Sequence, residues 1–158
     1  LKTTFEPAAN LTRAQFAKIV VGALNLTPEY RGTFKDVAQS AWYAPYVDTA
    51  AAYGIVNGVG DGKFEPNRNI TRQEMAVIMA GYLAWKGIDT TPGTEASAYN
   101  IADLDDIAPW ALESVCFCYE KGLLSGRGTS FAPLANATRA EACVVLCGLH
   151  DFLTVSGG

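Results

Sequence analysis

The sequence is poor in features that many common functions need. It has one histidine and no nucleophile elbow, phosphate-binding loop or zinc-site spacing, so no residues stand out for catalytic roles. Lys and Arg number 12 against 16 Asp and Glu, and the net charge of −4 works against broad nucleic-acid binding. No apolar run reaches the ~18 residues of a membrane helix. We therefore expect no enzyme, no cofactor, no metal site, no nucleic-acid partner and no membrane span.

Sustained alternation of polar and apolar residues is also missing, so no sheet is expected beyond short pairings. What is present is a hydrophobic fraction of 49% with 18% charged residues, which indicates an ordered globular chain. With 158 residues, the chain is long enough for one compact domain or for a few small repeats that share a core.

A short motif, Asn-x-Thr-Arg, occurs three times and each time opens an apolar run. Its threonine can cap a helix, and a Gln or Glu three residues later can close a capping box. The pairs are Thr12 with Gln15, Thr71 with Glu74, and Thr138 with Glu141. The arginine is unusual, because a helix N-terminus disfavours a cation by a few tenths to ~1 kcal/mol. Arg13, Arg72 and Arg139 therefore either pair with a carboxylate of the fold or help to hold an outside anion.

The motif belongs to a longer internal repeat. The second half of the repeat begins at Phe5, Phe64 and Phe131, whereas the first half occurs only twice, from Phe34 and from Ile101. We divide the chain into the second half of unit 1 (1–30), unit 2 (31–88), a polar linker (89–100), unit 3 (101–153) and a tail (154–158). Because unit 1 lacks its first half, we expect the natural N-terminus to lie upstream of this sequence.

Each full unit indicates two helices joined by a Gly-rich loop. The first helices are expected over residues 42–53 and 110–121, ended by Gly54 and Gly122. The second helices follow the capping threonines, and in unit 2 one face shows helical spacing of Met75, Ile78, Met79 and Tyr82. The loop "GVGDGKFEPN" fails the ligand spacing of a calcium loop and is interpreted as a turn. The predicted fold is all-α.

The order F-x-D-V, W-x-A, G-I/L-x-x-G and D-G-x-F-x-P-x-x-x-I-T-R-x-E resembles the S-layer homology domain. The resemblance covers most of residues 34–83 and 101–153, and half a unit at 1–24. It implies tandem helix-loop-helix units in a pseudo-threefold, three-pronged arrangement. It also implies an extracellular module that non-covalently anchors a bacterial surface protein to the cell wall. The ligand implied is a secondary cell-wall polysaccharide with pyruvate ketals, bound in grooves between units.

Carried over by position, the resemblance implies four kinds of binding residue. Arginines clamp the anion, aspartates bond sugar hydroxyls or orient an arginine, tryptophans form walls, and glycines shape the loop. These residues are Arg13, Arg72, Arg139, Asp36, Asp103, Trp42, Trp110, Gly58 and Gly126. The chemistry fits, since an arginine and free amides at a helix end suit a carboxylate, and a Trp face packs against a sugar.

Departures from the family pattern predict which groove keeps the most intact motif. Gln15 replaces the motif Glu in unit 1, and unit 3 lacks the Asp-Gly that unit 2 has at residues 61–62. We therefore expect the groove of Arg72, with Glu74, to be the most intact. Three alternatives stay open: arginines in internal salt bridges, tryptophans in the core, and aspartates as caps or turn formers. If Arg72 and Arg139 point into internal salt bridges rather than into open grooves, the alternative function is a protein-interaction or assembly scaffold that has lost sugar binding.

Two further expectations concern burial. Three cysteines align with alanines of unit 2 and should be buried, whereas Cys116 aligns with Asp48 and should be more exposed. The three are Cys118, Cys143 and Cys147. The missing half of unit 1 should leave an apolar stripe near Phe16, Ile19 and Val20, through which we expect self-association.

Overall fold

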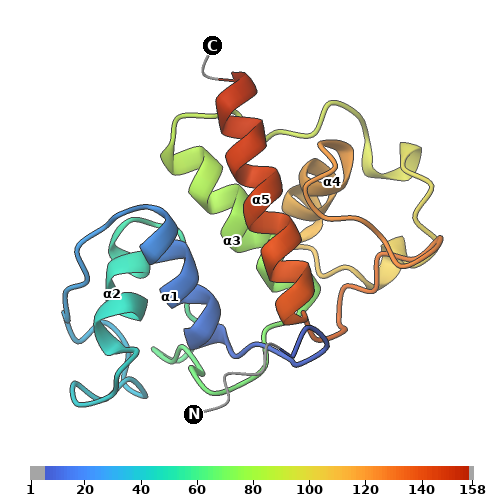
Figure 1. Ribbon diagram of the computed structural model, residues 1–158. Helices are drawn as coiled ribbons and strands as arrows, with labels where there is room; N and C mark the ends of the chain where they lie inside the picture. Colours follow the sequence, from blue (N-terminus) through green and yellow to red (C-terminus); the bar gives the residue numbers. More distant parts are fainter. Residues whose placement is uncertain (1–5, 157–158) are drawn as a thin grey trace.

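The structure, a computed structural model, describes residues 6–156 of the chain (Figure 1). Within this range it consists of five α-helices and two short 3-10 helices, and it contains no strand. The elements are α1 (Arg13–Ala23), α2 (Ala44–Ala52), α3 (Arg72–Trp85), η1 (Ala96–Ala98), η2 (Leu104–Asp106), α4 (Leu112–Glu120) and α5 (Arg139–Ser156). The all-α prediction is confirmed. None of the helices described is both long and apolar enough for a membrane span.

The second helix of each unit, α1, α3 and α5, begins as the motif predicts. In each copy the threonine hydroxyl accepts a hydrogen bond from the N–H three residues later, and that Gln or Glu side chain accepts one from the threonine N–H. All three capping boxes are therefore formed. The predicted face of α3 is buried: Met75, Ile78, Met79 and Tyr82 are all core residues.

The three Asn-x-Thr segments meet at the first turns of α1, α3 and α5, which Figure 1 shows close together. The residue between Asn and Thr bonds its counterpart in cyclic order. The N–H of Ile70 donates to Leu11 (2.9 Å), that of Ala137 to Ile70 (2.9 Å), and that of Leu11 to Ala137 (3.3 Å). Every unit is therefore hydrogen-bonded to both others, although the segments lie far apart in the sequence.

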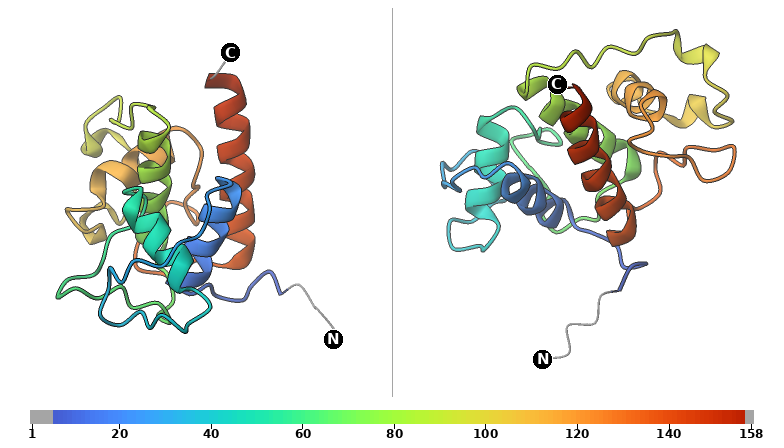
Figure 2. Two further views of the ribbon diagram at one scale, coloured as in Figure 1. Left: turned by 90° about the vertical axis from the view of Figure 1, so that its left-hand side faces the viewer. Right: turned by 45° about the horizontal axis from the view of Figure 1, so that its top comes forward.

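Two of the three second helices pack against the first helix of the following unit. α1 packs against α2, and α3 packs against α4 (Figure 2). The thiol of Cys118 on α4 lies 3.6 Å from the carbonyl oxygen of Ala76 on α3. Within residues 6–156, no first helix packs against α5 in this way.

This packing order overturns the predicted apolar stripe on unit 1. Phe16 and Val20 are buried, because unit 1 keeps its partner helix α2. Among the second helices described, the one that packs against no first helix is α5, not α1, and accordingly Cys143 and Cys147 on α5 are exposed. The prediction that these two cysteines are buried is wrong for the same reason.

The expected exposure of Cys116 is also wrong, because this position faces inward in both units. Its counterpart Asp48 is fully buried, although its side chain is a carboxylate. The Asp48 carboxylate accepts hydrogen bonds from the amides of Arg31, Gly32 and Thr33, at 2.7, 2.8 and 3.3 Å. A buried carboxylate with such donors is satisfied, so the Asp in unit 2 did not indicate a surface position. Cys118 is buried, as predicted.

Candidate functional site

Arg13 is a buried side chain, 4% exposed, that joins unit 1 to unit 2. Its guanidinium donates from Nε to the carbonyl of Phe64 (2.8 Å) and from Nη2 to that of Asn57 (3.1 Å). Its Nη1 donates to Glu74 (2.9 Å), the glutamate of the next unit's motif. The guanidinium carbon also lies 4.6 Å from the centre of the Phe64 ring. Arg13 therefore fastens two units together.

Arg72, 1% exposed, repeats these contacts between units 2 and 3. It donates to the carbonyls of Phe131 (2.9 Å) and Ser125, pairs with Glu141 at 2.5 Å, and lies over the Phe131 ring. Both arginines thus form internal ion pairs, which is one of the two alternatives that the sequence left open. Glu74 belongs with Arg13, so the expectation that Arg72 shares a groove with Glu74 is wrong. Sugar contact by these arginines stays a prediction.

The helix ends do not offer the free amides that we expected. The N–H groups of Arg13 and Ala14 donate to the carbonyls of Arg68 and Pro66, at 2.9 and 3.0 Å. The first two amides of α3 and of α5 make the same bonds to a neighbouring unit, and the capping boxes use the others. An outside anion must therefore be held by side chains rather than by helix amides.

A second arginine on each motif glutamate escaped the sequence reasoning. Arg68 donates to Glu74 at 2.6 and 3.2 Å, and Arg127 donates to Glu141 at 2.9 and 3.1 Å. The two arginines occupy different positions of the repeat, so aligning the units does not reveal them. One signal was available: the units with a motif Glu have an arginine in the loop before it, and unit 1, with Gln15, has none between Phe5 and Asn10.

Both motif glutamates are kept ionised by this surrounding positive charge. Burial raises the pKa of Glu74, but hydrogen bonds from Arg68 and the Thr71 amide, with the charge of Arg13, outweigh burial and hold the pKa below its ordinary value of 4.5. The pKa of Glu141 is lowered in the same way, against burial. Burial lowers the pKa of Arg13 and of Arg72, yet arginine remains charged in proteins.

Asp36 and Asp103 hold the Phe-x-Pro turn of their own unit. The two oxygens of Asp36 accept from the amides of Phe64 and Glu65, at 2.8 and 2.7 Å. Asp103 accepts from the two equivalent amides at 2.6 and 2.8 Å. Glu65 has a φ of 56°, which is unfavourable for a residue with a side chain, and the Asp36 bonds hold the backbone there. These contacts match the turn-forming alternative.

Gly58 and Gly126 lie where the chain passes too close for a side chain. A Cβ on Gly58 would lie 2.7 Å from the carbonyl oxygen of Lys63 and 2.9 Å from the Phe34 ring. A Cβ on Gly126 would lie 2.7 Å from the carbonyl oxygen of Ser130. Both glycines thus allow a tight loop. The loop around Gly58 closes as a turn, with Lys63 donating to Gly60 at 2.9 Å, as its sequence predicted.

Trp42 and Trp110 are surface residues, 53% and 61% exposed, so the core alternative is wrong for both. Trp42 stands edge-on to Tyr43, with 5.3 Å between ring centres, and its ring lies 5.4 Å from the ammonium of Lys18. Each exposed indole offers a flat apolar face beside a groove.

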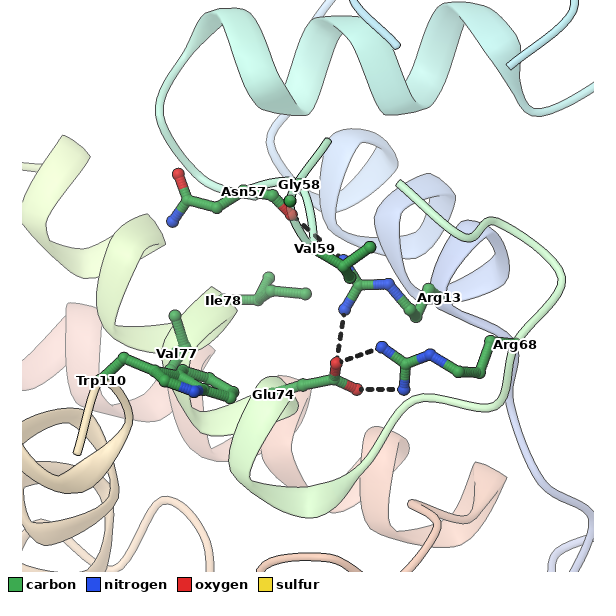
Figure 3. Close-up of a pocket in the computed structure, with 10 residues that line it drawn as sticks. Arg13, Asn57, Gly58, Val59, Arg68, Glu74, Val77, Ile78 and Trp110 are labelled. Atoms are coloured by element: carbon green, nitrogen blue, oxygen red, sulfur yellow. Dashed lines mark hydrogen bonds and ion pairs between the residues drawn. The ribbon is translucent and has the colours of Figure 1, made fainter. Parts of the chain in front are cut away.

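All three units contribute to one cavity of about 560 Å³, here named the Arg13 groove. Unit 1 supplies Arg13 and unit 3 supplies Trp110. Unit 2 supplies the Gly loop 57–60, with Arg68, Glu74, Val77 and Ile78. Figure 3 shows the two arginines and Glu74 on one side of the groove and Trp110 with Val77 on the other. An ion-pair network therefore faces an aromatic wall across a cavity.

The two related grooves each lack one part. The groove of Arg72, about 230 Å³, has a Gly loop at 123–126 but no tryptophan. The groove of Arg139, about 490 Å³, has Trp42, Gln15 and Lys18 but no Gly loop. Within the described part of the chain, the Arg13 groove is the one that combines arginine, Gly loop and tryptophan.

The arrangement of these repeated motifs agrees with a comparison of the sequence with known families. The sequence pattern of the S-layer homology domain matches residues 33–76 and 100–143, more than half of the chain. The chain belongs to the S-layer homology domain family. The predicted family is therefore confirmed. The predicted location at the bacterial cell surface and the predicted role of a surface-anchoring module are confirmed with it.

Similar proteins are much longer than this chain. The chain is 36% identical over 94% of its length to an amylopullulanase of Thermoanaerobacterium thermosulfurigenes, of which it covers 8%. It is 31% identical over 89% of its length to a surface-layer 125 kDa protein of Lysinibacillus sphaericus, of which it covers 12%. It is 29% identical over 90% of its length to a cellulosome-anchoring protein of Acetivibrio thermocellus, of which it covers 32%. An enzyme name among the relatives thus describes a protein of which the S-layer homology domains are a small part.

Proposed function

We propose that this S-layer homology module binds an anionic secondary cell-wall polysaccharide of the pyruvate-ketal type in the Arg13 groove, and so attaches a larger protein to the cell wall. The observation that carries the proposal is the meeting of arginine, Gly loop and tryptophan in one cavity of about 560 Å³. Ligand sites in proteins commonly have volumes of about 300–1,000 Å³. The names of the surface-layer and cellulosome-anchoring relatives support the same function.

The arginines of the groove can receive a carboxylate while they keep their contacts to Glu74 and to backbone carbonyls. Arginine has five N–H donors, and the described contacts of Arg13 use three of them. Arg68 also pairs with Glu65 at 2.6 Å, but both side chains are partly exposed, at 38% and 43%. Because an exposed ion pair contributes only ~0–1 kcal/mol, a ligand carboxylate can displace Glu65 from Arg68 at little cost.

The opposite wall suits the apolar face of a sugar ring. Trp110 is 61% exposed, and Val77 and Ile78 line the groove beside it. Aromatic side chains gain energy by covering C–H groups, and their polar edges stay in water. A pyruvylated sugar would then lie between Trp110 and the two arginines, with its ketal carboxylate toward Arg68.

The test compares Arg68→Ala with Arg127→Ala, its counterpart on Glu141 in the Arg72 groove, in binding to purified cell walls. Loss of a charge-assisted hydrogen bond costs about 1.5–3 kcal/mol, so Arg68→Ala should weaken binding by roughly 10- to 100-fold. Arg127→Ala should leave binding nearly unchanged. The unaltered module should no longer bind walls from which the pyruvyl groups have been removed. Equal binding to both kinds of wall would show that the ketal is not the group recognised.

One observation favours the second candidate, an assembly scaffold without sugar binding. Arg13 and Arg72 already have glutamate partners and two carbonyl partners each. A scaffold of this kind would keep its fold and its unit contacts, and the unaltered module would not sediment with cell walls at all.

A further inference from the structure

Gln73 is a buried polar side chain that reaches from unit 2 to unit 3. It lies in the first turn of α3 and is 4% exposed. Its side-chain oxygen accepts a hydrogen bond from the backbone N–H of Ala108, at 3.0 Å. The residues aligned with it in units 1 and 3 are Ala14 and Ala140, whose side chains cannot accept a hydrogen bond. This contact is therefore particular to the junction between units 2 and 3.

The bond from Ala108 to Gln73 fixes the turn that carries Trp110. The carbonyl of Ala108 accepts a hydrogen bond from the N–H of Ala111 at 2.8 Å, which closes a four-residue turn ahead of α4. Pro109 takes the second position of this turn, where its fixed φ is favourable, but it has no N–H to donate. The Ala108 amide is therefore the last backbone donor before Trp110, and Gln73 is its acceptor.

Trp110 depends on this turn because few groups hold its ring. The side chain is 61% exposed, and Val77 lies beside it in the groove (Figure 3). The ring of Trp42, by contrast, packs against Tyr43 and the ammonium of Lys18. In the part of the chain that the structure describes, no aromatic ring or cation packs on the Trp110 indole in this way. The position of the indole is therefore set mainly by its backbone.

Among the described residues, the turn that carries Trp42 has no counterpart of the Gln73 bond. α1 has Ala14 at the position of Gln73. Ser40, two residues before Trp42, is exposed. The additional bond thus occurs beside the groove that also has the arginine and the Gly loop.

We infer that Gln73 is a positioning residue for the Arg13 groove, because it holds the Trp110 turn in place across the cavity from Arg13 and Arg68. Gln73 itself does not line the groove, so it acts through Trp110 and not by touching a ligand. A wall that is ordered beforehand spares the complex the entropy cost of ordering it. The effect on ligand binding rests on the proposed function, whereas the effect on the mobility of Trp110 does not.

The first measurement follows Trp110 in the absence of any ligand. Trp42→Phe and Trp85→Phe leave Trp110 as the single tryptophan of the three. In that protein Gln73→Met, which keeps the length of the side chain but replaces its amide oxygen, should lower the fluorescence anisotropy of Trp110, because the turn moves more freely. The matched control keeps Trp42 as the only tryptophan, and there Gln73→Met should leave the anisotropy unchanged.

The second measurement asks whether Gln73 affects binding through Trp110. With the purified wall polymer, Gln73→Met should weaken binding by roughly three- to tenfold, the range that one hydrogen bond can contribute. In a Trp110→Ala background, the same substitution should weaken binding by less than about twofold, because residues that act as one unit are not additive. A general loss of stability would weaken binding equally in both backgrounds.

Two results would overturn the inference. One is unchanged anisotropy of Trp110 in folded Gln73→Met protein, and the other is an equal loss of binding in both backgrounds. Should Gln73→Met fail to fold, Gln73→Ala repeats both measurements with the residue that units 1 and 3 have at this position. Full binding by Trp110→Ala would instead contradict the proposed function, and the anisotropy alone would then decide whether Gln73 holds the Trp110 turn.

Discussion

At the scale of single residues, the arginine of Thr-Arg-x-Gln/Glu reaches away from its own helix. The motif predicted the caps, because Thr and Glu three residues apart are a local signal. It could not predict the arginine's partner, since Arg13 and Glu74 are 61 residues apart and two of the acceptors are backbone carbonyls without a sequence signature. The cost of a cation at a helix N-terminus is offset by a buried ion pair and these carbonyl bonds.

Replacing Arg72 therefore tests the stability of the fold rather than binding alone. Arg72→Ala leaves Glu141 with Arg127 as its remaining arginine partner and takes the donor from the buried Phe131 carbonyl and from the Ser125 carbonyl. Leaving a buried acceptor without its donor costs about 1–3 kcal/mol, so Arg72→Ala should destabilise the fold clearly. Arg127→Ala removes a half-exposed arginine from the same glutamate and should cost at most ~1 kcal/mol. Urea unfolding of both variants gives the two values, and equal costs would mean that burial of Arg72 contributes nothing.

The cysteines divide by exposure, not by their alignment with alanine. Burial raises the pKa of the Cys118 thiol to about 12, so it holds almost no thiolate at neutral pH. Burial also raises the pKa of Cys116. Titration of the native protein should therefore show two fast thiols, and Cys143→Ser with Cys147→Ser should abolish the fast phase. Four fast thiols, or none, would contradict this assignment.

At the scale of elements, neighbouring units are joined by helix packing and by one Arg–Glu pair each. The helices and their approximate ranges followed from periodicity and from Gly54 and Gly122. The partner of each helix did not, because the sequence does not say whether α1 packs on its own unit or on the next. That ambiguity is why the unpaired face was expected near Phe16 and is found on α5.

The Arg–Glu contacts between units make stability fall at acid pH. The folded pKa of Glu74 lies below 4.5, so its stabilising effect is fully present above 4.5 and is lost as the pH falls through the lowered value. Glu74→Gln, which copies Gln15 of unit 1, should lower the melting temperature at pH 7 and reduce its further loss between pH 4.5 and 3. If the melting temperatures of both proteins fall in parallel as the pH is lowered, Glu74 is not the titrating group.

At the scale of the whole molecule, the proposed binding groove is formed by three units. Arg13, Gly58 and Trp110 were named from the family motif, but Arg68 was not. The grouping was not predicted either, since Arg13, Glu74 and Trp110 come from three different repeats. The ranking of grooves by motif completeness therefore favoured Arg72, whereas the structure assembles the complete set around Arg13. The residues that line a groove therefore depend on the order in which the three units contact one another.

The most direct test of this account compares Trp110→Ala with Trp42→Ala in binding to the purified wall polymer. The two tryptophans are equivalent in the repeat and similarly exposed, but Trp110 lines the complete groove and Trp42 the one without a Gly loop. Truncating a tryptophan anchor costs about 2 kcal/mol or more, so Trp110→Ala should weaken binding by roughly 30-fold, and Trp42→Ala by less than about twofold. Equal losses, or a larger loss for Trp42→Ala, would contradict the assignment of binding to the Arg13 groove.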